Sequence, residues 1–132
     1  MAADDGPTSA LGLGRIWHAT RYSLHGLAAT YRHEAAFRQE LALAAVLMPL
    51  AVALALWSPL TWTQCALLLA SVMLVLLVEL LNSALESVVD RISEDHHELS
   101  KRAKDTGSAA VLLALVICAT VWFFVLIDVF GR

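Results

Sequence analysis

Charged residues are scarce in this sequence, which argues against a soluble domain. They make up 16% of the chain, whereas 59% of the residues are hydrophobic, and a typical soluble domain carries about 25% charged residues. A chain of 132 residues with this balance is expected to be a small integral membrane protein.

Other features of known functional classes are also absent. The two cysteines, Cys65 and Cys118, both lie inside apolar segments, so we expect packing residues and neither a disulfide framework nor a thiolate metal site. The first apolar run begins too late for a secretory signal. There is no Gly-rich phosphate loop of the Walker type and no protein-kinase signature. Any nucleotide would therefore bind at a non-standard site.

Three apolar segments are present instead, at residues 41–57, 62–82 and 109–127. Each is close to the roughly 20 residues that a helix needs to cross the hydrocarbon core of a bilayer. The sequence therefore predicts an all-α membrane protein with three transmembrane helices, the first of which carries Pro49 and could be kinked or tilted.

Lysine and arginine indicate the orientation of these spans. They precede the first span and fill the connection between the second and third: Arg15, Arg21, Arg32 and Arg38, then Arg91, Lys101, Arg102 and Lys104. The turn between the first two spans has none. Because basic residues concentrate in cytoplasmic loops, we expect the N-terminus and residues 91–108 to face the cytoplasm.

The N-terminal region divides into two parts. Residues 1–12 are rich in Ala, Asp, Gly and Pro, and we expect them to be disordered. Over residues 13–34, apolar side chains such as Trp17 and Leu24 fall on one helical face and basic side chains on another. This pattern predicts an amphipathic helix on the membrane surface. The alternative is a soluble helix that packs on a partner.

A polar stripe follows the second apolar segment. Glu79, Asn82, Ser83, Glu86 and Asp90 are spaced by three, four and seven residues, so they share one face of a helix. Polar groups that face lipid are costly, so the stripe is expected to face protein or water. One interpretation is a hydrogen-bonded helix seam; the other, which two glutamates favour, is a functional site.

Two further polar clusters flank the membrane, at residues 34–40 and 93–108. Either could be no more than solvated charge at a helix end or in a loop. Adjacent histidines such as His96 and His97 point apart on a helix, and no third ligand at a suitable spacing is evident, which argues against zinc. Carboxylates without a His/Cys set suit Mg²⁺, and the basic residues beside them suit a phosphate.

The sequence motifs in these clusters are specific. They are EAAFRQE at 34–40, VELLNSALE at 78–86, VDR at 89–91, RAKD at 102–105 and GS at 107–108. In this order they resemble the bacterial integral-membrane diacylglycerol kinase family, over residues 15–108. The resemblance implies a homotrimer in the bacterial inner membrane, with a surface helix and three spans per subunit and sites shared between neighbours. It also implies Mg²⁺-dependent transfer of the ATP γ-phosphate to the primary hydroxyl of diacylglycerol; no nucleic-acid partner is expected.

The same resemblance assigns roles to residues. Glu79 matches the general base and Asn82 an amide beside it, while Glu34 and Glu86 match the carboxylates that hold Mg²⁺ on the nucleotide phosphates. The matched nucleotide contacts are Tyr22, Glu34, Glu86, Asp95, His96, His97, Lys104 and Asp105. The matched positions of the lipid site are Arg15, Ala36, Phe37, Arg38, Gln39, Glu40, Glu79 and Ser108.

Two rival functions stay open at this point. The first keeps the chemistry but takes a polyprenol such as undecaprenol as the acceptor. The second is a small channel, transporter subunit or scaffold, since an intramembrane carboxylate also suits a proton relay. Glu34, Glu86 and the Lys104–Asp105 pair argue against the second rival, because a relay needs no nucleotide site.

Overall fold

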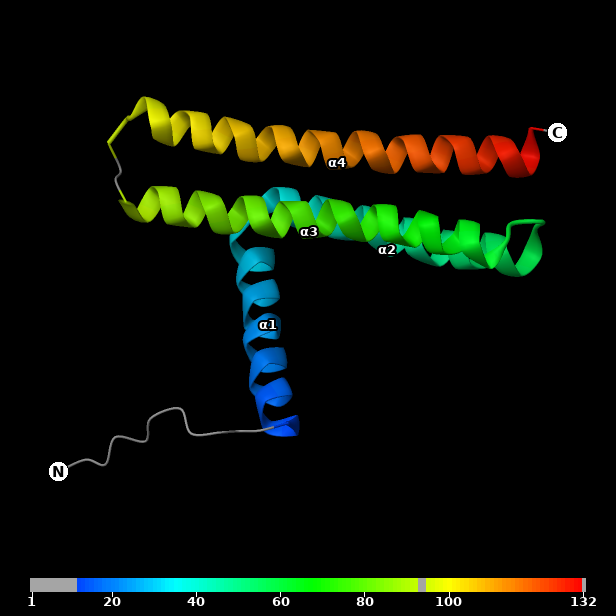
Figure 1. Ribbon diagram of the computed structural model, residues 1–132, viewed down its shortest axis with the longest axis horizontal. Coiled ribbons are helices and arrows are strands. Elements are labelled where there is room, and N and C mark those ends of the chain that lie inside the picture. The colour runs from blue at the N-terminus through cyan, green and yellow to red at the C-terminus, as the bar shows by residue number, and fades with distance from the viewer. Residues whose placement is uncertain (1–11, 93–94, 132) are drawn as a thin grey trace.

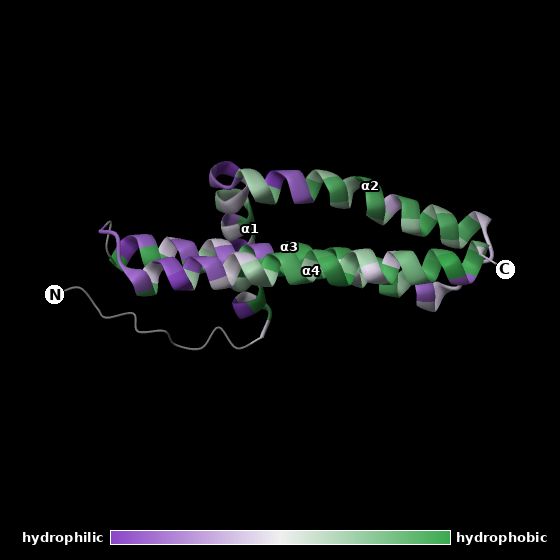
Figure 2. Ribbon diagram, turned by 90° about the horizontal axis from the view of Figure 1, so that it is seen from above, coloured by the Kyte–Doolittle hydropathy of each residue, from purple (hydrophilic) through white to green (hydrophobic). Residues whose placement is uncertain are grey.

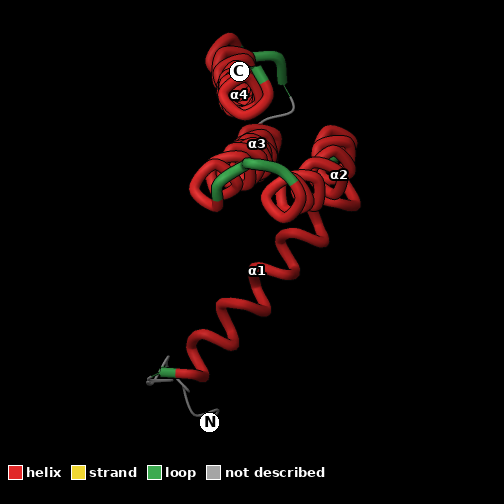
Figure 3. Tube along the Cα trace, turned by 90° about the vertical axis from the view of Figure 1, so that its right-hand side faces the viewer, coloured by secondary structure: helices red, strands yellow, loops and turns green. Residues whose placement is uncertain are grey.

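The computed structural model describes residues 12–92 and 95–131, and this part of the chain folds into four α-helices (Figure 1). The helices are α1 at Leu13–His33, α2 at Ala35–Trp57, α3 at Trp62–Ile92 and α4 at Glu98–Phe130. α3 packs against both α2 and α4, whereas α1 runs crosswise to these three (Figures 1 and 3). The disorder expected for residues 1–12 concerns a segment that, apart from Gly12, lies outside the described residues.

The three long helices, α2 to α4, are each long and apolar enough to cross a membrane. Helices suit that setting because their backbone groups are paired internally, where no water is available. α1 buries none of its residues, and its apolar face, including Trp17, Leu24 and Tyr31, is exposed. The predicted all-α arrangement of an N-terminal helix and three candidate spans is confirmed.

The long helices extend beyond the apolar segments seen in the sequence. α3 continues past residue 82 to Ile92, and α4 begins at Glu98, well before residue 109. Hydropathy identifies only the apolar part of each helix. The polar residues that follow the apolar part of α3 and precede that of α4 are helical as well. The polar parts gather toward one end of the molecule (Figure 2). Apart from Asp128 near the end of α4, the acids and bases of the two helices are therefore brought to the same side of the apolar layer.

Small residues allow the three spans to pack closely. The buried core contains Ala44, Ala51, Leu60, Cys65, Leu68, Val72, Trp122 and Val125. The alanines of α2 leave room for the side chains of α3, as is typical of helix seams in membranes. Pro49 lies inside α2 without ending it, and both cysteines are free.

A single residue, Glu34, makes the bend between α1 and α2. Its backbone is extended, with φ −109° and ψ 113°. Nη1 of Arg38 donates hydrogen bonds to the carbonyls of Tyr31 at 2.9 Å and Arg32 at 3.2 Å. The last carbonyls of a helix lack partners within it, and a cation there also complements the helix dipole. Arg38 thus ties α2 to the end of α1 and fixes the position of Glu34.

Candidate active site

The acidic cluster centres on Glu79 of α3. Among the described residues, Glu79 is the only charged side chain that is buried, at 4% exposure. Glu34 at the bend, Glu40 of α2 and Glu86 of α3 all interact electrostatically with it. No ion pair joins Glu79 to a basic group in the described part of the chain. Three carboxylates from three segments therefore lie within electrostatic range of Glu79, where a bound cation would be stabilising.

Asn82 connects this cluster to α4. Its Nδ2 donates a hydrogen bond to Oε1 of Glu86 at 3.2 Å. Its Oδ1 is buried without a hydrogen-bond partner and packs against Gly107. The amide thus orients one of the carboxylates predicted to hold the metal.

A cleft of about 630 Å³ opens between α1 and α3. Its lining residues are Ser23, Gly26, Leu27, Ala29, Thr30, His33 and Glu34 on one side, and Leu80, Ser83, Ala84 and Ser87 on the other. Most of the lining is apolar, with a fringe of hydroxyl groups. Glu34 belongs to both the cleft and the acidic cluster, so the two adjoin at this residue.

A second cleft, of about 530 Å³, lies between α3 and α4 at the polar end of the molecule. It brings together five of the predicted nucleotide contacts: Asp95, His96, His97, Lys104 and Asp105. Val89, Asp90, Ser100 and Lys101 complete the lining. The polar stripe predicted from the sequence contributes to both clefts, because Ser83 lines the first and Asp90 lines the second.

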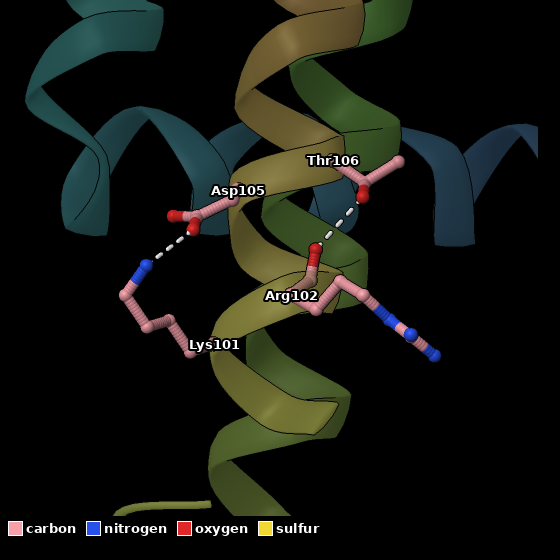
Figure 4. Close-up of polar contacts among 4 residues, drawn as sticks. All are labelled: Lys101, Arg102, Asp105 and Thr106. Atoms are coloured by element: carbon pink, nitrogen blue, oxygen red, sulfur yellow. Dashed lines mark hydrogen bonds and ion pairs between the residues drawn. The ribbon is translucent and has the colours of Figure 1, made fainter. Parts of the chain in front are cut away.

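Ion pairs organise the second cleft. Nζ of Lys104 lies 2.6 Å from Oδ1 of Asp90. Nζ of Lys101 lies 2.7 Å from Oδ2 of Asp105, as Figure 4 shows. Nδ1 of His97 accepts a hydrogen bond from the Leu99 N–H at 3.0 Å and so caps α4. The cleft presents two ammonium groups beside carboxylates, and ammonium groups of this kind could bind a phosphate.

Comparison with known proteins now identifies the family. A family model described as prokaryotic diacylglycerol kinase matches residues 21–126. The chain belongs to the prokaryotic diacylglycerol kinase family. It is 50% identical over 120 residues to the diacylglycerol kinase of Escherichia coli strain K12, covering 91% of this chain and 95% of that protein.

Two further relatives support the assignment. The diacylglycerol kinase of Haemophilus influenzae is 49% identical over 111 residues, which cover 84% of this chain and 91% of the relative. That of Pseudomonas aeruginosa is 48% identical over 116 residues, which cover 88% and 91%. The family resemblance expected from the motifs is confirmed, and the chain is an enzyme of the kinase class.

Other predicted site residues of this kinase lie apart from the two clefts. Arg15 and Tyr22 are exposed on α1, and Ser108 is exposed on α4. Within α2, Ala36 and Gln39 are exposed, whereas Phe37 is buried at 3% exposure. The guanidinium of Arg38 donates its hydrogen bonds to backbone carbonyls at the end of α1. In a single chain, several residues of the predicted lipid site are therefore exposed and lie outside both clefts.

The sequence motifs assign no role to some of the residues that line the clefts. Asp90 belongs to the polar stripe, but its partner Lys104 is on another helix. Lys101 could have been found from its four-residue spacing to Asp105, which favours an ion pair on a helix. Ser83 is also on the stripe, but its position in the α1–α3 cleft depends on the bend at Glu34.

The carboxylates around Glu79 fit the magnesium role predicted for Glu34 and Glu86. Within the described residues, no group of three or more His, Cys, Asp and Glu side chains is close enough to enclose a metal ion. Mg²⁺ usually takes only one or two protein carboxylates and completes its shell with phosphate oxygens and water. Two glutamates that both interact electrostatically with Glu79 match that requirement.

Proposed function

We propose that this chain transfers the γ-phosphate of ATP to the primary hydroxyl of diacylglycerol and forms phosphatidate. The observation that carries the proposal is the burial of Glu79, without a counter-charge in the described chain, beside Glu34 and Glu86. The relatives are named diacylglycerol kinases, and the family assignment sets the reaction class. Phosphoryl transfer requires mainly positioning of the reactants and neutralisation of phosphate charge. The α1–α3 cleft can position the lipid, and the α3–α4 cleft can bind the nucleotide phosphates.

Glu79 acts as the general base in this proposal. Its carboxylate accepts the proton of the lipid hydroxyl while the hydroxyl oxygen forms a bond to the γ-phosphorus. The bond from that phosphorus to the bridging oxygen breaks, and ADP leaves with the electron pair. Asn82 keeps Glu86 in place, and Mg²⁺ held by Glu34 and Glu86 would neutralise phosphate charge. A lipid hydroxyl reaches only the interface, so Glu79 is expected at the cytoplasmic end of its span.

ATP is proposed to bind in the α3–α4 cleft. Lys101 and Lys104 would meet its phosphates, with Asp95, His96 and His97 nearby. Tyr22 and the exposed lipid-site residues lie outside this cleft in one chain, which supports a homotrimer in which neighbouring subunits complete each site. We place the assembly in the bacterial inner membrane, with the polar ends of α3 and α4 in the cytoplasm, because these ends carry Arg91, Lys101, Arg102 and Lys104.

The test is transfer of labelled phosphate from ATP to a short-chain diglyceride by the purified protein in detergent micelles. We expect labelled phosphatidate that requires Mg²⁺, and a lower rate with undecaprenol as the acceptor. A clear preference for the polyprenol would change the acceptor and leave the chemistry intact. Ion flux in liposomes without ATP, together with no lipid phosphorylation, would contradict the kinase reaction for this chain.

A further inference from the structure

The hydroxyl of Ser83 is buried and unused. The side chain is 6% exposed, its Oγ has no hydrogen-bond partner in the described chain, and it lines the α1–α3 cleft. Two other serines of the same helix behave differently: Ser71 donates to the Leu68 carbonyl at 2.8 Å, and Ser87 donates to the Ser83 carbonyl at 2.9 Å. Buried hydroxyls in native proteins usually have a partner, so the free Oγ of Ser83 points to a ligand.

The remaining hydroxyls of the cleft are already engaged. Ser23 and Thr30 each donate to a backbone carbonyl of α1 at 3.0 Å, and Ser87 donates within α3. Such bonds to the preceding turn are the usual way for hydroxyls to be satisfied inside helices. Among the described residues that line this cleft, Ser83 alone offers an uncommitted hydroxyl.

The lining of the cleft selects the chemistry of that ligand. Leu27, Leu80 and Ala84 give it apolar walls, and in the part of the chain that the structure describes, His33 and Glu34 are its only ionisable lining residues. Without a lysine or arginine in this lining, and with a carboxylate at one end, the cleft disfavours a phosphate or another anion. The α3–α4 cleft, which has two lysines, suits the nucleotide instead. An uncharged ligand with hydrocarbon and a few oxygen atoms suits the cleft beside Ser83.

We propose that Ser83 binds the acceptor lipid by donating a hydrogen bond to an ester carbonyl of its glycerol backbone. The inference rests on the proposed function and adds a binding residue to it. Ser83 follows Glu79 by four residues, so the two side chains share a helix face about 6 Å apart along the axis. A glyceride ester is separated from the free hydroxyl by only a few bonds. Ser83 can therefore hold the ester while the hydroxyl faces Glu79.

The test combines a protein change with a lipid change. Ser83→Ala and the wild type are each assayed with a short-chain diacylglycerol and with the matching ether-linked dialkylglycerol, which keeps the hydroxyl but lacks the ester carbonyl. For the diacylglycerol, we expect Ser83→Ala to raise the KM about 3- to 10-fold, the usual range for one hydrogen bond. The KM for ATP and the kcat should stay near the wild-type values. For the ether lipid, the two proteins should have the same KM.

Stability separates this role from a structural one. Because the Ser83 hydroxyl makes no hydrogen bond within the described chain, Ser83→Ala should unfold at the wild-type temperature or above it. Ser71→Ala, which removes a bonded hydroxyl away from both clefts, is the matched control and should leave both lipid KM values unchanged. If Ser83→Ala is not recovered folded, the near-isosteric Ser83→Cys, a much weaker hydrogen-bond donor, serves in the same comparison.

Each remaining outcome overturns the assignment. An equal rise in KM for the ester and the ether lipid would mean that Ser83 does not contact the carbonyl. A lower unfolding temperature of the oligomer, with no selective effect on the ester lipid, would mean that a second copy of the chain fills the cleft. If the wild type phosphorylates neither lipid, the proposed function fails as well; if it is active and Ser83→Ala equals it on both, only the role of Ser83 fails.

Discussion

The side chain of Asn82 on α3 packs directly against Gly107 on α4. A Cβ atom at position 107 would collide with Oδ1 of Asn82 and lie 3.2 Å from its Cγ. Glycine inside a helix is destabilising by roughly 0.5–1 kcal/mol relative to alanine, so its place in α4 needs a reason. The close approach supplies one, because it lets Asn82 lie between the helices and donate to Glu86.

Gly107→Ala should therefore damage the site through Asn82. The new methyl group would push the amide away from Glu86 and separate α4 from α3 locally. We expect a loss of stability of about 1–3 kcal/mol, as is usual for overpacking, and a fall in kcat of at least about tenfold. Thermal unfolding and the phosphatidate assay measure the two effects.

The sign of the stability change tests this explanation. In an Asn82→Ala background the methyl group has room, so Gly107→Ala should then be stabilising by about 0.5–1 kcal/mol, the ordinary helix preference for alanine. If the substitution destabilises both backgrounds equally, the contact with Asn82 is not the reason for the glycine.

The sequence predicts features that depend on one segment at a time. Apolar length predicts the spans, and helical spacing places Glu79, Asn82 and Glu86 on one face of α3. These patterns depend on periodicity and hydropathy within one segment, so they can be read without knowing how the helices pack. The acidic stripe can therefore be recognised from the order of residues along the chain.

Features that depend on two segments could not be predicted. The Lys104–Asp90 pair and the fit of Gly107 against Asn82 require the register between α3 and α4. The hydrogen bonds from the Arg38 guanidinium to the end of α1 depend on the bend at Glu34. No spacing along the chain carries that information.

Glu79→Gln should abolish turnover while nucleotide binding survives. The amide fills the same space but cannot accept the lipid proton, and loss of a general base typically costs about 10²- to 10⁴-fold in rate. The phosphatidate assay measures the rate, and equilibrium dialysis with labelled ATP and Mg²⁺ measures binding. Substantial activity in this variant would remove Glu79 from the role of base.

Glu86→Gln should act on the metal instead. Asn82 can still donate to the amide oxygen, so the local packing is retained, but one negative ligand is lost. We expect a higher Mg²⁺ concentration for half-maximal rate, or weaker ATP binding, with partial recovery at saturating Mg²⁺. A phenotype identical to that of Glu79→Gln at every Mg²⁺ concentration would contradict the separation of base and metal ligand.

Arg38→Ala should loosen α1. It removes both hydrogen bonds to the carbonyls of Tyr31 and Arg32, and a hydrogen bond to a charged group is worth about 1.5–3 kcal/mol when shielded from solvent and less on an exposed surface such as this one. We expect faster tryptic cleavage within α1, at Arg21 or Arg32, with little change in the unfolding temperature of the spans. Arg38→Lys, which keeps the charge but not the planar donor group, should be intermediate. Cleavage at the wild-type rate would show that the membrane alone holds α1.

Lys104→Gln separates a nucleotide contact from a structural ion pair. The Lys104–Asp90 pair is partly exposed, and such pairs contribute about 0–1 kcal/mol to stability, so the variant should unfold close to the wild-type temperature. A phosphate contact is different, because an ammonium group facing several phosphate charges contributes directly to binding. We therefore expect the KM for ATP to rise by about tenfold, with the KM for diglyceride unchanged. Salt screens exposed charges, so raising the ionic strength should weaken ATP binding less in the variant than in the wild type. An unchanged KM for ATP with a lower unfolding temperature would mean that Lys104 serves only to join α4 to α3.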